Sequence, residues 1–180
     1  MIMPPALRKT VLFTHVITSV GWLGAVLAYL ALDLTTVASQ DTATVRGAYT
    51  GMGLIVGYAI VPLALASLLI GIINALGTTW GLLRHWWVVV KLILTLVATL
   101  ILLQETSSVS YLADLAETAP DPRTLSSTLP HSIGGLLILL TTALLSVFKP
   151  RGLTRYGWRK QQRRIHRRDR DTAPASLISE

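Results

Sequence analysis

The sequence predicts an all-α protein, a four-helix bundle that spans a membrane. Of its 180 residues, 52% are hydrophobic and only 14% are charged, whereas a soluble domain carries about 25% charged residues. The mean hydropathy is +0.57, and four long apolar runs occupy most of the chain. We therefore expect one transmembrane domain, residues 1–148, followed by a basic tail, residues 149–180.

Each apolar run has about the ~20 residues that cross a hydrocarbon core. We predict four helices, over about 10–32, 51–76, 85–103 and 131–148. Polar connections are expected at 35–48 and 104–130, and Pro62 should kink the second helix. The first run follows Arg8 and Lys9 but is too long for the apolar part of a signal peptide, so we expect it to be a retained span.

Positive charge predicts the orientation of the bundle. The tail from Lys149 onward holds ten of the sixteen Lys and Arg residues, and Arg84 lies in the short second connection. The first and third connections hold one arginine each, Arg46 and Arg123. Because positive residues favour the cytoplasmic side, both termini should be cytoplasmic in a multi-pass protein of the inner cell membrane.

The basic tail suggests partners. We expect it to contact anionic lipid or to dock a soluble protein, at about 1 kcal/mol per basic residue near a charged surface. Nucleic acid is not expected, because no aromatic residues are interleaved with the charge to form a stacking platform. The chain contains no cysteine, which excludes disulfides, thiolate metal sites and cysteine nucleophiles.

The first predicted helix carries a polar and aromatic stripe. At 100° per residue, six side chains fall within about 40° of one line: His15, Ser19, Trp22, Val26, Tyr29 and Asp33. The opposite face, Val16, Val20, Leu27 and Leu34, suits lipid, and Gly21 and Gly24 would admit a close neighbour. An imidazole inside an apolar span is costly, so His15 is a candidate functional residue. The alternative is a packing histidine that is bonded to a neighbouring helix.

A second stripe follows the third predicted helix. It contains Arg84, Trp87, Lys91, Thr95, Ala98, Leu102 and Glu105. Lys91 lies about 9 Å along the helix from His85, which is a depth similar to that of His15. If the two stripes face each other, His15 and Lys91 form one site. Alternatively, Lys91 extends its ammonium group to nearby lipid headgroups.

The other histidines have simpler interpretations. His85, beside Trp86 and Trp87, is typical of an interfacial belt. His131 opens the fourth helix on the outer side, roughly 20 Å in depth from His15, so the two cannot ligate one haem iron. His166 lies in the charged tail and should be solvated.

The residues favour a pocket for a planar ligand. A haem site needs a neutral imidazole, flanking aromatic rings and a cation for the propionates or as a second ligand. His15, Trp22 and Lys91 can supply these, and the same residues suit a quinone or another planar apolar ligand. Copper conduction is less favoured because the chain offers only three methionines as soft ligands. Hydrolysis is less favoured because no nucleophile has an adjacent base.

Two segments carry a family resemblance. HVITSVGWLGAVL resembles the first-helix pattern His-(six residues)-Trp-x-Gly of copper-resistance D-type membrane proteins, of haem-containing protoporphyrinogen oxidases and of related bacterial membrane families. HWWVVVKLILTLV resembles their third helix, and the segment from His131 to Lys160 is similar to small actinobacterial membrane proteins. The resemblance implies a compact four-helix bundle, with His15 as a haem ligand and Lys91 as a second ligand or functional cation. Three membrane histidines are too few for the di-haem cytochrome b pattern.

These observations lead us to expect a protein that binds one haem b, or a similar planar redox ligand, near the cytoplasmic face for an oxidoreductase reaction. His15 would ligate the metal, Lys91 would be catalytic or a ligand, and Trp22 and Trp87 would line the pocket. One alternative is a non-enzymatic anchor subunit, as a homo-oligomer or within a larger complex. Another is a transporter of the copper-resistance type.

Overall fold

The computed structural model describes residues 3–78, 81–150 and 152–172. Within these ranges all the named secondary-structure elements are helices, and the extended pairing consists of one isolated β-bridge. The elements are α1 (Pro5–Ala38), α2 (Thr42–Ile55), the π-helix η1 (Val56–Ile60), α3 (Val61–Gly77), α4 (Trp86–Thr118), the 3-10 helix η2 (Pro122–Thr124), α5 (Leu129–Phe148) and α6 (Arg155–Thr172). Residues 151 and 173–180 of the predicted tail lie outside the described residues.

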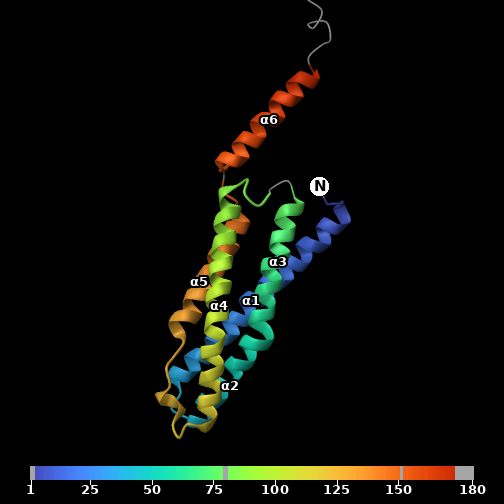
Figure 1. Ribbon diagram of the computed structural model, residues 1–180. Coiled ribbons are helices and arrows are strands. Elements are labelled where there is room, and N and C mark those ends of the chain that lie inside the picture. The colour runs from blue at the N-terminus through green and yellow to red at the C-terminus, as the bar shows by residue number, and fades with distance from the viewer. Residues whose placement is uncertain (1–2, 79–80, 151, 173–180) are drawn as a thin grey trace, which may run out of the picture.

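The chain has four long helical segments, which run up and down to form a bundle (Figure 1). α2, η1 and α3 follow one another as a single long segment, and α1 and α4 lie diagonally, each packed against this segment and against α5. Four segments are long and apolar enough to cross a membrane: Pro5–Ala38, Thr42–Gly77, Trp86–Thr118 and Leu129–Phe148. The start of α1, the α3–α4 link and α6 lie at one end of the bundle, and the α1–α2 and α4–α5 connections lie at the other (Figure 1).

The helices are longer than the apolar runs that predict them. α1 continues to Ala38 and α2 already begins at Thr42, so the prediction of a polar connection over 35–48 was wrong. α4 likewise continues to Thr118, well into the predicted connection 104–130. Hydropathy shows only which part of a helix is apolar. A helix continues into polar sequence as long as its backbone hydrogen bonds continue, so it can be longer than its apolar part.

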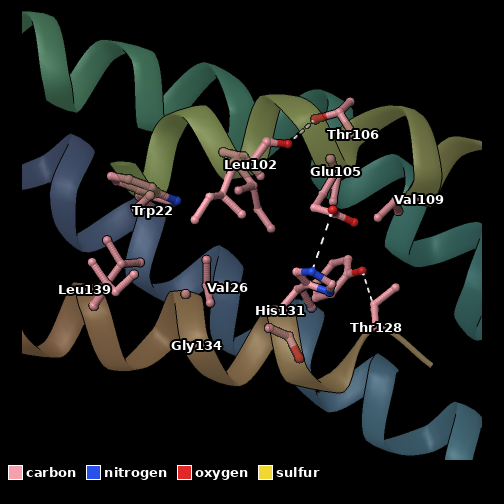
Figure 2. A pocket seen from close by; sticks show the side chains of 18 of the residues that line it. Trp22, Val26, Leu102, Glu105, Thr106, Val109, Thr128, His131, Gly134 and Leu139 are labelled. Carbon is pink, nitrogen blue, oxygen red and sulfur yellow. Dashed lines mark hydrogen bonds and ion pairs between the residues drawn. The ribbon is translucent and has the colours of Figure 1, made fainter. Parts of the chain in front are cut away.

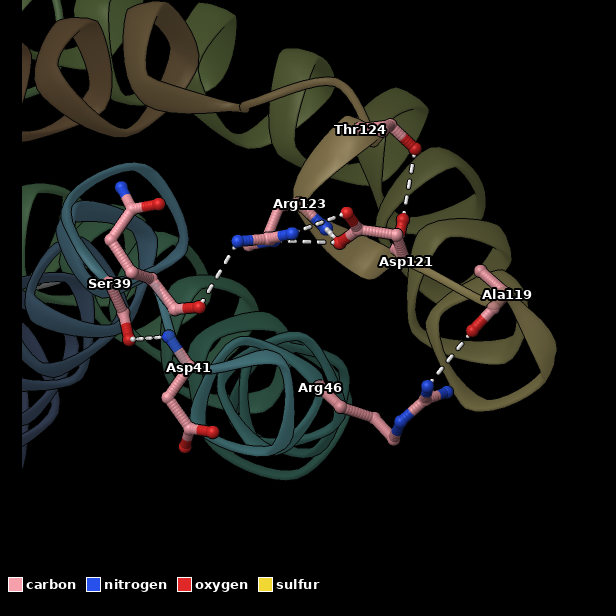
Figure 3. A network of polar contacts seen from close by, with 8 residues as sticks. Ser39, Asp41, Arg46, Ala119, Asp121, Arg123 and Thr124 are labelled. Carbon is pink, nitrogen blue, oxygen red and sulfur yellow. Dashed lines mark hydrogen bonds and ion pairs between the residues drawn. The ribbon is translucent and has the colours of Figure 1, made fainter.

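Polar side chains define these extended helix ends. Asp41 caps α2 by accepting a hydrogen bond from the Thr44 backbone N–H at 2.9 Å. At the end of α4, the guanidinium group of Arg46 donates to the carbonyls of Ala116, Glu117 and Ala119, and Figure 3 shows it reaching Ala119. Carbonyls in the last turn of a helix lack partners within the helix. Arg46 of α2 therefore supplies hydrogen-bond donors to the C-terminal end of α4.

The second segment departs from α-helical geometry just before Pro62, the residue at which the sequence predicts a kink. The five-residue π-helix Val56–Ile60 stands immediately before α3, in which Pro62 occupies the first turn. Proline provides no N–H and its ring crowds the preceding turn, so a wider turn just before it accommodates the ring. Val56 and Ile60 are both buried and point to the bundle interior.

The core confirms the predicted stripe on α1. Trp22, Val26, Tyr29 and Asp33 are buried, and the opposite face is about half exposed. Gly21 faces the Leu63 side chain, to which an added Cβ would lie at 3.4 Å. The expectation for Gly24 was wrong, because an added Cβ there would meet nothing within 4 Å.

α6 is joined to the bundle by defined contacts. The Thr154 hydroxyl donates to the Leu83 carbonyl at 2.6 Å, the Thr154 N–H donates to the Arg84 carbonyl at 3.0 Å, and Leu153 forms a β-bridge with His85. Gly157 lies so close to the Arg84 carbonyl that a Cβ would clash with it. The first turn of the tail helix is therefore fixed to the α3–α4 link, while α6 itself points away from the bundle (Figure 1).

Candidate functional site

His15 lies in the seam between α1 and α3. Its imidazole packs on Gly71, where an added Cβ would lie 2.9 Å from Cε1, and its buried Nδ1 has no hydrogen-bond partner among the residues that the structure describes. One turn further along, the hydroxyl groups of Ser19 and Ser67 are 2.7 Å apart. Polar groups thus join α1 to α3 at this level of the bundle.

Lys91 points into the bundle from α4. Its Nζ donates to the Ser146 hydroxyl on α5 at 2.7 Å, and Ser146 in turn donates to the Thr142 carbonyl. Lys91 is therefore bonded to α5, whereas His15 packs against α3.

The two predicted tryptophans lie apart from each other. Trp22 is 4% exposed and lines a cavity. Trp87 is at the first turn of α4, where its ring centroid is 6.5 Å from that of His85. Neither Trp87, Lys91 nor His15 lines the cavity that contains Trp22. The four predicted residues do not surround one space.

That cavity, of about 250 Å³, lies between α1, α4 and α5 and is closed on the fourth side by η1. Most of its wall is aliphatic, as Figure 2 shows for Val26, Leu102, Val109 and Leu139. Its polar groups gather at one end: Tyr29, Glu105, Thr106, Thr128, His131 and Ser132. An apolar space with a few convergent polar groups is the usual form of a small-molecule site.

An acid and a base face each other at the polar end. His131 Nε2 on α5 is 3.7 Å from Glu105 Oε1 on α4 (Figure 2), and the two side chains are 54% and 24% exposed. Beside them, the hydroxyl groups of Tyr29 and Thr128 are 2.7 Å apart. This end of the cavity offers both hydrogen-bond donors and acceptors to a bound molecule.

Behind this wall lies Asp33, which is 0% exposed. Its carboxylate accepts hydrogen bonds from the hydroxyl groups of Thr128 at 2.9 Å, Ser132 at 2.8 Å and Ser127 at 3.3 Å. All three donors precede or begin α5, so Asp33 joins the end of α1 to the start of α5.

A second cavity, of about 330 Å³, lies at the end of the bundle opposite α6. Its lining is polar and includes Ser39, Gln40, Asp121, Arg123 and Ser127. Arg123 pairs with Asp121 at 2.7 Å and donates to the Gln40 carbonyl at 3.2 Å (Figure 3). Hydrogen bonds from Arg123 lower the pKa of Asp121 to about 2.

Sequence reasoning missed His131 as a site residue, and it gave Asp33 and Glu105 no role. Asp33 and Glu105 nevertheless belong to the two predicted stripes, four residues beyond Tyr29 and three residues beyond Leu102. Following both stripes to their ends would have found the two carboxyl groups, and His131 lies in the first turn of α5, which packs against both helices.

Comparisons of the chain with protein-family models, with curated proteins and with solved structures gave no match. The fold itself defines an all-helical bundle with four segments suited to cross a membrane. The site defines a partly open cavity that is apolar along its length and polar at one end.

Proposed function

We propose that this chain is a multi-pass protein of the inner cell membrane with both termini in the cytoplasm. The length and composition of the four helical segments support insertion, as do the apolar side chains on their outer faces. Arg8, Lys9, Arg84 and the basic helix α6 lie at one end of the bundle. The positive-inside rule makes that end cytoplasmic.

Within the bundle, the protein binds a planar redox ligand of the quinone class and serves an oxidoreductase reaction. The single observation that carries this proposal is the apolar cavity that ends at the His131–Glu105 pair. An imidazole N–H donates to a quinone carbonyl, a carboxylate accepts from a quinol hydroxyl, and the aliphatic wall accepts the ring. In the proposed orientation this polar end is toward the outer side of the membrane, so the expected cytoplasmic position of the ligand is revised.

Haem b fits these residues less well. The buried Nδ1 of His15, which has no partner, is the kind of atom that ligates iron. However, the ring packs against Gly71, and the cavity does not reach His15. A macrocycle at His15 would require α1 and α3 to separate.

A titration of the detergent-purified protein with decyl-ubiquinone tests the proposal. We expect saturable quenching of tryptophan fluorescence, which Trp22→Phe greatly reduces because Trp22 lies in the cavity wall. His131→Ala should weaken binding about tenfold, which corresponds to one lost hydrogen bond of ~1.4 kcal/mol. The matched control is His166→Ala, because His166 is exposed on α6.

Two results would contradict the quinone proposal. One is quenching that does not saturate, or that is equal in the His131 and His166 variants. The other is a Soret band in the purified protein that His15→Ala abolishes, which would establish haem as the ligand. Absorbance spectra of the oxidised and reduced protein therefore accompany the titration.

The contacts that hold the first turn of α6 to the α3–α4 link favour a second candidate function. This function is that of an anchor subunit that docks a soluble protein. Arg155, Arg159, Lys160 and Arg163 are exposed on a helix whose first turn is held by the α3–α4 link. Under this proposal a companion protein co-purifies in stoichiometric amount, and changing these four residues to glutamine releases it. Arg8→Gln with Lys9→Gln, at the same end of the bundle, is the control and should retain the companion. Purification of the full chain alone would contradict the anchor function.

A further inference from the structure

Asp33 is a buried carboxylate in the wall between the two cavities. In the part of the chain that the structure describes, no cation pairs with it, and its hydrogen bonds come from hydroxyl groups alone. A buried carboxylate without a cation is costly. The hydrogen bonds that join Asp33 to the start of α5 need an acceptor oxygen and not a full charge, and the proposed quinone site does not contact Asp33. Such a group within an apolar bundle is a candidate for proton transfer.

The hydrogen bonds around Asp33 have a defined direction. A hydroxyl group has one proton to donate, and Thr128 donates its proton to Asp33 Oδ2 at 2.9 Å. In the 2.7 Å contact between Tyr29 and Thr128, the donor is therefore Tyr29. The chain runs from the Tyr29 hydroxyl through Thr128 to the carboxylate, whose other oxygen accepts from Ser127 at 3.3 Å.

The two ends of this chain line different spaces. Tyr29 and Thr128 belong to the wall of the apolar cavity, next to His131 and Glu105. Ser127 belongs to the wall of the polar cavity at the end of the bundle. Asp33 lines neither cavity, but it accepts hydrogen bonds from Thr128, which lines the apolar cavity, and from Ser127, which lines the polar cavity.

We propose that Asp33 and its flanking hydroxyl groups conduct protons between the apolar cavity and the polar cavity. When a proton reaches the Thr128 oxygen, the Thr128 hydroxyl passes its own proton to Asp33, which becomes a neutral carboxyl group. After this group rotates, it gives a proton through the Ser127 hydroxyl to the polar cavity, and the carboxylate is restored. One proton crosses the wall and no electron moves.

The titratable groups that surround Asp33 are consistent with this path. They are Tyr29 on α1 and Tyr49 on α2, with Glu105 on α4 and His131 on α5 on the far side of Tyr29. Tyr49 donates toward the Leu125 and Ser126 carbonyls beside Ser127. In the proposed path, the acid and the base that line the same cavity as Tyr29 exchange protons with its inner end.

Infrared spectroscopy after a rapid pH drop tests the path on the full-length protein in detergent, without any ligand. We expect a carboxyl C=O band that Asp33→Asn removes. Ser127→Ala should slow the appearance of this band at least tenfold, and Ser127→Thr, which keeps the hydroxyl, should restore the rate. Thr124→Ala is the matched control: it also removes a hydroxyl group from the wall of the polar cavity, but Thr124 donates to the Asp121 carbonyl and not to Asp33.

Equal rates in the Ser127→Ala and Thr124→Ala variants would overturn the proposal, as would the absence of any band that depends on Asp33. If Asp33→Asn does not fold, Asp33→Glu keeps the carboxyl group and identifies the band by its shift. Because no quinone is used, failure of this test is distinguishable from failure of the quinone titration.

Discussion

Replacing Asp33 with alanine is expected to lower the free energy of unfolding by about 3–5 kcal/mol. Three hydroxyl groups lose their bond to the carboxylate, and two of them are buried, because Asp33 is 0% exposed and Thr128 and Ser132 are 7% and 6% exposed. The third, that of Ser127, faces the polar cavity. The contact also joins α1 to α5 across 94 to 99 residues of sequence. Its loss should therefore separate the start of α5 from the bundle.

Unfolding of the detergent-purified protein in sodium dodecyl sulfate, followed by circular dichroism, measures this effect. Ser132→Ala removes one of the three hydrogen bonds and should cost roughly 1 kcal/mol. Asp33→Asn keeps the volume and one acceptor oxygen, so its cost should fall between those of the other two variants. If Asp33→Ala is as stable as Ser132→Ala, the carboxylate does not hold α1 to α5.

Much of the fold follows from hydropathy and helical periodicity. The four apolar runs predict the four long segments, and the angular positions of Trp22, Tyr29 and Asp33 predict which face of α1 is buried. The polar ends of the helices cannot be predicted from hydropathy or periodicity. They are held by contacts such as that of Arg46 with the end of α4, which joins residues 70 to 73 positions apart and leaves no periodic pattern.

The candidate site was only partly predictable, for a related reason. Periodicity predicts which side chains face the interior, and it placed His15 and Lys91 there. It does not show which interior region is filled and which is hollow, because that depends on the volumes of facing side chains. At His15 the imidazole fills the space above Gly71, whereas the cavity lies further along the bundle, where α4 and α5 meet at Glu105 and His131.

Replacing Arg46 with alanine is expected to lower the free energy of unfolding by about 2 kcal/mol. The guanidinium group donates to the Glu117 carbonyl at 2.5 Å and to the Ala119 carbonyl at 2.9 Å, besides that of Ala116. Without it, carbonyls at the end of α4 lose their donors, and a positive charge is lost at the negative end of the helix dipole. Hydrogen exchange in the last turn of α4, together with detergent unfolding, measures the effect.

The geometry of the contact predicts how other substitutions at this end behave. Arg46→Lys should restore less than half of the loss, because one ammonium group cannot reach three carbonyls in the planar arrangement that the guanidinium group provides. Arg123→Ala, in the exposed pair with Asp121, should cost clearly less than Arg46→Ala, since exposed ion pairs contribute little. If Arg46→Ala and Arg123→Ala have equal effects, the end of α4 is held by its apolar packing, in which Ala116 is 0% exposed, and not by the arginine.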